Sequence, residues 1–277
     1  MHWANRKTLL PVWEVPKKAG GYTNRISLEA AAREDLIPRV TGVIEDMIGY
    51  GYGLQQYLKR TVALAAERAV RKDDETDKAY VSRIIELAGE EARAARDRGK
   101  EVHSRVEQYL RGGQLPEDSA SADIGLQITA MRDACRPAYV EPEKHLSNDE
   151  CSGTADLVMS GVEDISAAYK LCVNAVPRTL GGSRVLMDLK TRVLKQDSKP
   201  YRTDLYQLGA YAWLEGLEDG DLMVLAVGDY RTGIVKFFAE TEVERWKQAF
   251  IGLWQAWKLE NNWEALRVKG DFWAMYR

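Results

Sequence analysis

The chain has 277 residues, of which 45% are hydrophobic and 29% are charged, and its formal net charge is −3. This is a globular composition, long enough for one large domain or for a core with a helical annex. No apolar run approaches the length of a membrane span, and charges and tryptophan stand where a signal peptide would be apolar, so we expect a cytoplasmic protein without a membrane partner.

The three cysteines are Cys135, Cys151 and Cys172. Their odd number and wide spacing argue against a disulfide framework and against a zinc ribbon. They are also too few for an iron–sulfur cluster held by four thiolates. We therefore expect buried thiols and no iron–sulfur cluster.

Residues 1–26 are predicted to form an irregular arm, because proline and glycine alternate there with aromatic residues. Five basic residues and one acidic residue give the arm a net charge of +4 (Arg6, Lys7, Glu14, Lys17, Lys18 and Arg25). The arm could clamp DNA through these charges, or they could form an ordinary solvated surface. We expect its aromatic side chains to cover a helix.

Residues 27–137 are predicted to form a helical region. Ser27 is placed to cap a short helix, and two longer helices are predicted over 42–70 and 79–110 from the spacing of their apolar residues. A third long helix is predicted over 122–135.

Residues 138–277 read as an α/β core. Strands are predicted near 138–145, 154–160 and 185–189, followed by a helix and then a hairpin of 222–227 and 234–238. We expect a mixed central sheet flanked by helices. Residues 160–182 are too many for a tight hairpin, so they must form an extra strand or an insertion.

The last predicted helix, 242–260, is rich in tryptophan. Its apolar stripe has helical spacing (Val243, Trp246, Phe250, Trp254 and Trp257). Tryptophans can stack on nucleic-acid bases, but so regular a stripe favours packing in the core.

The motif with the clearest chemistry is Asp188-Leu189-Lys190 in the third strand. Asp188 and Lys190 are two residues apart, so they project from the same face. Asp156 lies in the preceding strand, and its carboxylate can reach the same point if the two strands pair. Converging carboxylates repel one another unless a cation lies between them, and oxygen ligands suit Mg²⁺ or Mn²⁺. The cluster therefore predicts a divalent metal beside Lys190, which can orient a water or, if burial depresses its pKa, accept a proton.

Two helices add polar side chains to this cluster. Gln207 and Tyr211 are four residues apart, and so share one face of the helix after the Asp-Leu-Lys strand, where Thr203 or Asp204 is expected to be the cap. His103 lies on the inward face of its helix. A histidine there is commonly a core residue, but the downstream motifs favour a role at the metal.

These motifs resemble the PD-(D/E)XK nucleases, and within them the RecB-like and phage-type exonucleases. Asp156 stands at the acid of the family's G-x-x-D, Asp188 and Lys190 at its D-x-K, and Gln207 and Tyr211 at its Q-x-x-x-Y. The segment from Gly99, GKEVHSRVEQYL, is similar to the family's helix with a single histidine, and VEPEKHL from Val140 resembles the strand that often carries a site glutamate. That glutamate would be Glu141 or, as second choice, Glu143.

The resemblance implies a restriction-endonuclease-like core that hydrolyses DNA to 5′-phosphate and 3′-hydroxyl ends. The metal would be held by Asp156, Asp188 and the backbone carbonyl of Leu189, with His103 and Glu141 completing the site and Lys190 as a catalytic residue. The resemblance favours an exonuclease over an endonuclease. The phage-type branch also suggests a virus-encoded protein, and a homo-oligomer or a recombination or repair protein as partner.

Other functions stay open at this point. The chain could be a catalytically silent DNA-binding or scaffolding module that retains the nuclease fold, a site-specific endonuclease, or an enzyme that cuts RNA. The basic segment 184–202 favours a nucleic-acid partner, because it carries six basic residues and two acidic ones, a net charge of +4. The expected DNA-binding residues are Arg192, Lys195, Lys199, Arg202, Gln207 and Tyr211.

Overall fold

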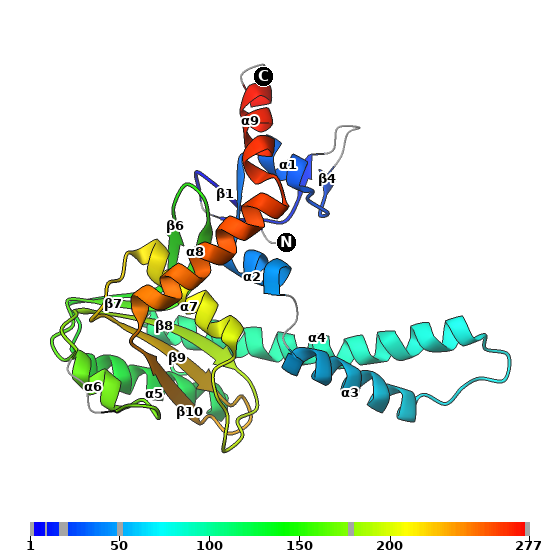
Figure 1. Cartoon of the computed structure of the whole chain (residues 1–277). Helices are drawn as coiled ribbons and strands as arrows, with labels where there is room; N and C mark the ends of the chain where they lie inside the picture. Colours follow the sequence, from blue (N-terminus) through cyan, green and yellow to red (C-terminus); the bar gives the residue numbers. More distant parts are fainter. Residues whose placement is uncertain (1–2, 9, 17–21, 49–51, 177–179, 275–277) are drawn as a thin grey trace.

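A five-stranded mixed sheet lies at the centre of the computed structural model, which describes residues 3–8, 10–16, 22–48, 52–176 and 180–274. The strands are ordered β10-β9-β8-β7-β6, with β8 parallel to β9 and the other neighbours antiparallel. Their bounds are β6 (Tyr139–Ser147), β7 (Ser152–Ser160), β8 (Arg184–Thr191), β9 (Leu222–Gly228) and β10 (Val235–Glu240). The predicted α/β fold with a mixed, helix-flanked sheet is confirmed (Figure 1).

Helices cover both faces of this sheet (Figure 1). One face packs against α2 (Val40–Ile48), α7 (Arg202–Glu215) and α8 (Val243–Glu260), and we call it the α7 face. The other packs against the inner half of α4 (Asp77–Leu110), α5 (Ser119–Cys135) and α6 (Ile165–Lys170), and we call it the α5 face. Two separate apolar clusters result, one on each side of the strands.

An extra strand or an insertion was expected between β7 and β8, and among the described residues of this segment the structure has an insertion with a short helix, α6. Asp164 caps this helix by accepting a hydrogen bond from the Ala167 backbone N–H. Helix α7 begins two or three residues earlier than predicted. Its cap residue is Tyr201, and Asp204, expected as the cap, instead accepts a hydrogen bond from the Tyr201 backbone N–H at 3.0 Å.

The N-terminal part is more regular than predicted. It contains a three-stranded sheet and a two-stranded sheet, built from β1 (Trp3–Asn5), β2 (Pro11–Val12), β3 (Val15–Pro16), β4 (Tyr22–Thr23) and β5 (Leu36–Pro38). Helix α1 (Leu28–Arg33) follows, capped by Ser27 as expected. The prediction of an irregular arm was therefore wrong. Lys17 and Lys18, which contribute to its predicted charge, lie outside the described residues.

Trp3 does cover a helix, because its ring lies 5.4 Å from that of Trp263 at the start of α9 (Trp263–Ala274). The tryptophans of α8 pack as predicted. Trp254 and Trp257 are fully buried and stack at 5.1 Å, and their indole N–H groups donate to Glu150 and Asp46. The three cysteines are free and buried.

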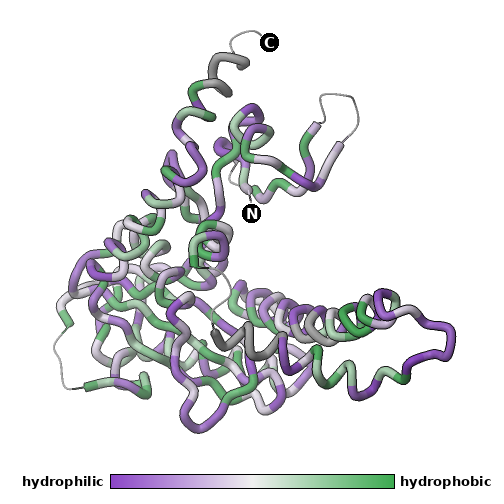
Figure 2. The backbone as a smooth tube through the Cα atoms, turned by 45° about the vertical axis from the view of Figure 1, so that its right-hand side comes forward, coloured by the Kyte–Doolittle hydropathy of each residue, from purple (hydrophilic) through white to green (hydrophobic). Residues whose placement is uncertain are grey.

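Helix α3 (Tyr52–Arg68) pairs with the outer half of α4 to form a hairpin that extends away from the sheet in both views (Figures 1 and 2). Its own core is small, consisting of Ala65, Ala69, Ile84 and Ala88 with Ala66 and Tyr80 beside them. No helix in the described parts of the chain combines the length and apolarity needed to span a membrane.

Candidate active site

The site lies where β7 and β8 separate. Their pairing runs from Ser160–Arg184 to Leu157–Met187, and Asp156 and Asp188 are the next residues beyond it. There the carboxylate of Asp156, rather than a β7 carbonyl, accepts a hydrogen bond from the backbone N–H of Leu189. Asp156 therefore fills the gap between the two strands, and its charge reaches both faces of the sheet.

Strand alternation breaks at the same level. Ala155 and Val158 both pack on the α7 face although they are three positions apart, while Leu157 packs on the α5 face. The matching irregularity in β6 is at Glu143, which lies opposite Asp156 and has a φ of 49°. A left-handed backbone costs a residue with a side chain roughly 1–2 kcal/mol, so the surrounding structure must hold it.

This irregularity decides which glutamate joins the site. Glu143 turns toward Asp156, whereas Glu141 forms an ion pair with Lys144 at 2.7 Å, and Lys144 also pairs with Glu215 of α7 at 2.8 Å. Glu141 thus lies on the α7 side. Glu143, the second choice in the sequence, occupies the position beside Asp156 that was expected for Glu141.

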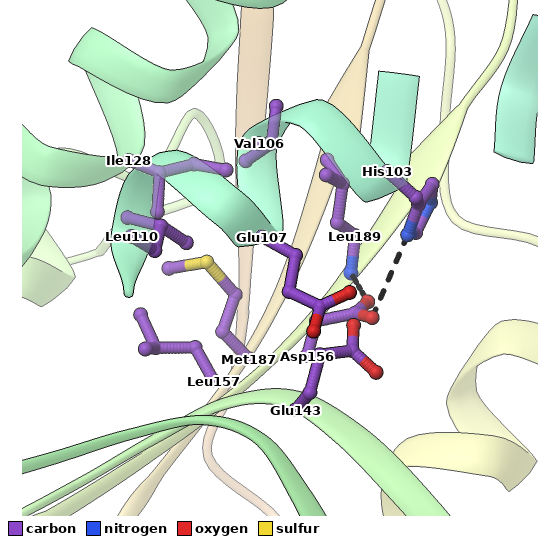
Figure 3. A pocket seen from close by; sticks show the side chains of 10 residues that line it. All are labelled: His103, Val106, Glu107, Leu110, Ile128, Glu143, Asp156, Leu157, Met187 and Leu189. Atoms are coloured by element: carbon purple, nitrogen blue, oxygen red, sulfur yellow. Dashed lines mark hydrogen bonds and ion pairs between the residues drawn. The ribbon is translucent and has the colours of Figure 1, made fainter. Parts of the chain in front are cut away.

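His103 reaches the site from α4. Its Nδ1 lies 3.5 Å from Oδ1 of Asp156, and His103, Glu143 and Asp156 each offer a ligand atom within 4.8 Å of the other two. Figure 3 shows the imidazole and the carboxylates turned toward one another at the mouth of an apolar cavity. The cavity has a volume of about 10 Å³, which is room for one water.

Asp188 and Lys190 occupy the α7 side of the fork. Asp188 is 2% exposed, and its Oδ2 forms an ion pair with Lys190 Nζ at 2.8 Å. Gln207 connects the two, accepting from Lys190 at 3.0 Å and donating to Asp188 Oδ1 at 3.1 Å. Its amide also donates to the Tyr211 hydroxyl at 2.7 Å.

Tyr211 explains the glycine of the G-x-x-D motif. A Cβ on Gly153 would come within 2.4 Å of Tyr211 Cε1, so only glycine lets the ring lie flat against β7. Tyr211 is 3% exposed and Gln207 is half-buried. Both brace the Asp188–Lys190 pair, and Tyr211 has almost no exposed surface through which it could contact DNA.

The charges in the fork act on one another. Burial, then the charge and hydrogen bond of Asp156, raise the pKa of Glu143 to about 8. Burial also raises the pKa of Asp188 to about 6, since Lys190 only partly offsets it and Asp156 adds to it. The pKa of Asp156 itself is lowered, because His103, Lys190 and the Leu189 N–H outweigh its burial.

The two cationic groups keep their protons more firmly than usual. Burial opposes the charge on His103, but Asp156 outweighs it, so the pKa of His103 is raised. Burial likewise opposes the charge on Lys190, yet Asp188 and Asp156 raise its pKa. Lys190 therefore does not have the depressed pKa that a proton acceptor would need in this state.

The donor set fits a divalent cation. Glu143, Asp156 and His103 bring two carboxylates and an imidazole together at the fork. The carboxylate of Asp188 is outside that group and is paired with Lys190 on the α7 side. In a strand, the N–H and C=O of one residue point to the same side, so the carbonyl of Leu189 faces the fork together with its N–H. Oxygen and imidazole ligands suit Mg²⁺, Mn²⁺ or zinc-like ions.

The basic residues that were expected to bind DNA lie in different surroundings in the structure. Arg192 is held by Asp204 at 2.6 Å and lies 4.2 Å from the ring centre of Tyr201, so it fixes the start of α7. Lys195 and Lys199 are exposed on the connection between β8 and α7, and Arg202 is exposed at the first residue of α7. Arg184, at the opposite end of β8, pairs with Asp221 at 2.8 Å.

Two neighbours of the site were missed. Glu107 is four residues after His103 and points toward Glu143 and Asp156 (Figure 3), which its helical spacing could have indicated. Arg39 pairs in an isolated bridge with Ser152, and its guanidinium lies 3.5 Å from the hydroxyl of Thr154, two residues before Asp156. Nothing in the sequence around Arg39 signals this contact.

No protein-family model matches the chain, and no curated protein is similar to it in sequence. Among solved structures, one titled "Crystal structure of SSO0001" is similar over 73% of this chain and 87% of its own length, with 15% identity and a TM-score of 0.29. A likeness that weak carries no argument about fold or function.

Proposed function

We propose that the protein is a metal-dependent deoxyribonuclease of the PD-(D/E)XK type, acting as an exonuclease. The observation that supports this most strongly is the position of Asp156, whose carboxylate fills the strand fork between His103 and the Asp-Leu-Lys segment. A half-buried His–carboxylate group next to a half-buried lysine suits hydrolysis of a phosphodiester, which must develop negative charge on its oxygens.

The cation, Mg²⁺ or Mn²⁺, would be held by Asp156, Asp188, Glu143, His103 and the Leu189 carbonyl. When bound, it would stabilise the charge that builds on the phosphate oxygens and the leaving 3′ oxygen. Such an ion would offset the repulsion between Asp156 and the carboxylates of Glu143 and Asp188, which raises the pKa of both.

Lys190 has a defined position in this proposal. An ammonium has three N–H donors, and two of them face Asp188 and Gln207. The third is left to orient the attacking water or to stabilise a phosphate oxygen. Gln207 is a positioning residue, because it holds Lys190 and Asp188, and Tyr211 supports it by accepting a hydrogen bond from its amide.

A single digest tests the activity. End-labelled linear DNA, a closed circle, single-stranded DNA and RNA are incubated with the protein, with Mg²⁺ or with EDTA. We expect Mg²⁺-dependent loss of linear DNA, 5′-phosphorylated products and an intact circle. Cutting of the circle would indicate an endonuclease, and cutting of RNA would change the substrate. Binding of DNA without any cleavage would favour a silent binding or scaffolding module.

A further inference from the structure

The outer part of α4 carries a basic face that begins at the candidate active site. Residues that precede His103 by three, seven and ten positions return to its side of a helix with 3.6 residues per turn. These residues are Lys100, Arg96 and Arg93. At 1.5 Å per residue, they extend about 15 Å outward from His103.

The sequence of α4 separates its charges along the axis. Residues 93–100 include four basic residues and one acidic residue (Arg93, Arg96, Asp97, Arg98 and Lys100), whereas residues 86–91, farther out, include three acidic residues and no basic one. An ordinary solvated helix mixes both signs in pairs one turn apart. Here the positive charge is concentrated on the part nearest the site.

The three basic side chains are available to a ligand. Arg93, Arg96 and Lys100 are exposed, and within the described parts of the chain Arg93 and Lys100 form no ion pair. Arg96 lies 3.9 Å from Asp97, with both side chains more than half exposed, a loose pair of little energy.

The start of this face is fixed to the sheet. A Cβ on Gly99 would meet the Thr191 hydroxyl at 2.9 Å, so α4 lies directly against the residue after Lys190. Arg98 lies 5.6 Å from the ring centre of Tyr230, in the turn after β9. The helix therefore leaves the body at the same end of β8 as the candidate active site, with its basic face leading outward.

We infer that Lys100, Arg96 and Arg93 bind the sugar–phosphate backbone of DNA next to the bond to be cut. This rests on the proposed function, since it takes DNA as the substrate. The hairpin of α3 and α4 then guides the substrate toward the fork, and its basic face covers about four nucleotides at 3.4 Å of duplex rise per nucleotide.

The test compares two triple variants with the same loss of charge. One is Arg93→Gln, Arg96→Gln, Lys100→Gln. The control is Lys72→Gln, Lys78→Gln, Lys170→Gln, with two changes at the far end of the hairpin and one on α6, all exposed. Circular dichroism and thermal melting establish that each is folded. Binding of a labelled duplex of about 20 base pairs is measured by fluorescence anisotropy with Ca²⁺, over a series of salt concentrations.

We expect the first variant to bind DNA at least tenfold more weakly than wild type, and the slope of log K against log salt to fall by about 3, which corresponds to three phosphate contacts. The control should bind like wild type. Hydrolysis of bis(p-nitrophenyl) phosphate, which is too small to reach the helix, should be equal in all three proteins if the wild type hydrolyses it.

The outcomes separate the two proposals. Unchanged affinity and salt slope in the first variant overturn the inference, even if the wild type digests DNA. A selective loss of binding supports it, even if the wild type cuts nothing and the nuclease proposal fails. A wild type that binds no DNA, or a control that loses as much affinity as the first variant, also overturns it.

Discussion

The carboxylate of Asp156 accepts a hydrogen bond from the backbone N–H of Leu189, the residue between Asp188 and Lys190. This bond replaces a rung of the β7–β8 ladder at the point where the two strands diverge. The two halves of the candidate site, one facing α4 and the other facing α7, are thereby fixed relative to each other. A change at Asp156 should accordingly disturb both halves.

Removing the Asp188–Lys190 pair should abolish DNA cleavage. Asp188→Ala and Lys190→Ala should each lower Mg²⁺-dependent digestion of linear DNA at least about a hundredfold, the cost of losing a preorganised charge at a reacting phosphate. The fold should remain, as judged by circular dichroism. A folded variant that retains full activity would refute the assignment of these residues.

Glu143 and Glu141 form a matched pair of acids on one strand. Glu143→Gln should weaken Mn²⁺ binding at least about tenfold by calorimetry, because a ligand at the fork is lost. Glu141→Gln should leave it unchanged, since Glu141 pairs with Lys144 instead. Equal effects of the two substitutions would contradict the backbone geometry at Glu143.

Gly153 should not tolerate a side chain. Gly153→Ala forces the Tyr211 ring away from β7 and should lower the free energy of unfolding by about 1–3 kcal/mol, the usual effect of overpacking. Gly252→Ala on α8 is the control, because a Cβ there meets nothing within 4 Å and should be neutral or stabilising. Urea denaturation measures both. Equal stability of the two variants would show that Tyr211 does not rest on Gly153.

The metal-free protein should lose stability as the pH rises. The pKa of Glu143 is raised from 4.5 to about 8 on folding, so its contribution is complete below pH 4.5 and is lost as the pH approaches 8. Asp188 acts in the same direction at lower pH, since its pKa is raised to about 6. In EDTA, the melting temperature should therefore fall between pH 5 and pH 8.

Two controls identify the group that makes the melting temperature fall with pH. Glu143→Gln should make the melting temperature depend less on pH, and so should saturating Mn²⁺, because the cation takes the place of the proton on Glu143. A melting temperature that stays constant across this range in EDTA, or a Glu143→Gln variant as steep as wild type, would contradict the prediction.

His103 should set the choice of metal. Imidazole favours Mn²⁺ over Mg²⁺ more than carboxylate does, so the wild type should bind Mn²⁺ more tightly. His103→Ala should reduce that preference, losing more affinity for Mn²⁺ than for Mg²⁺ in parallel calorimetric titrations. An unchanged Mn²⁺/Mg²⁺ ratio would place His103 outside the metal site.

Much of the sheet could be predicted from the sequence, because its strands are apolar runs bounded by turn residues. The strand around Asp188 and the hairpin of β9 and β10 lie within one or two residues of their predicted positions. The strands of the N-terminal part could not be predicted in this way, since two or three residues are too few to establish an alternating pattern.

The choice between Glu141 and Glu143 shows where the sequence rules reach their limit. Strict alternation puts both on one side of β6, so it offers no way to separate them. The left-handed backbone at Glu143 separates them, and a glutamate gives no local sign of such a conformation, unlike glycine or asparagine. Glu107, in contrast, could have been found from its spacing to His103.

The bridge between Arg39 and Ser152 has a consequence for how the chain can be divided. Once β8 has turned away, this contact covers the border of β7 at Ser152. A fragment starting at residue 138 would leave that border bare, and bare strand borders invite association with other chains. The segment ahead of the sheet thus protects this strand border from association with other chains.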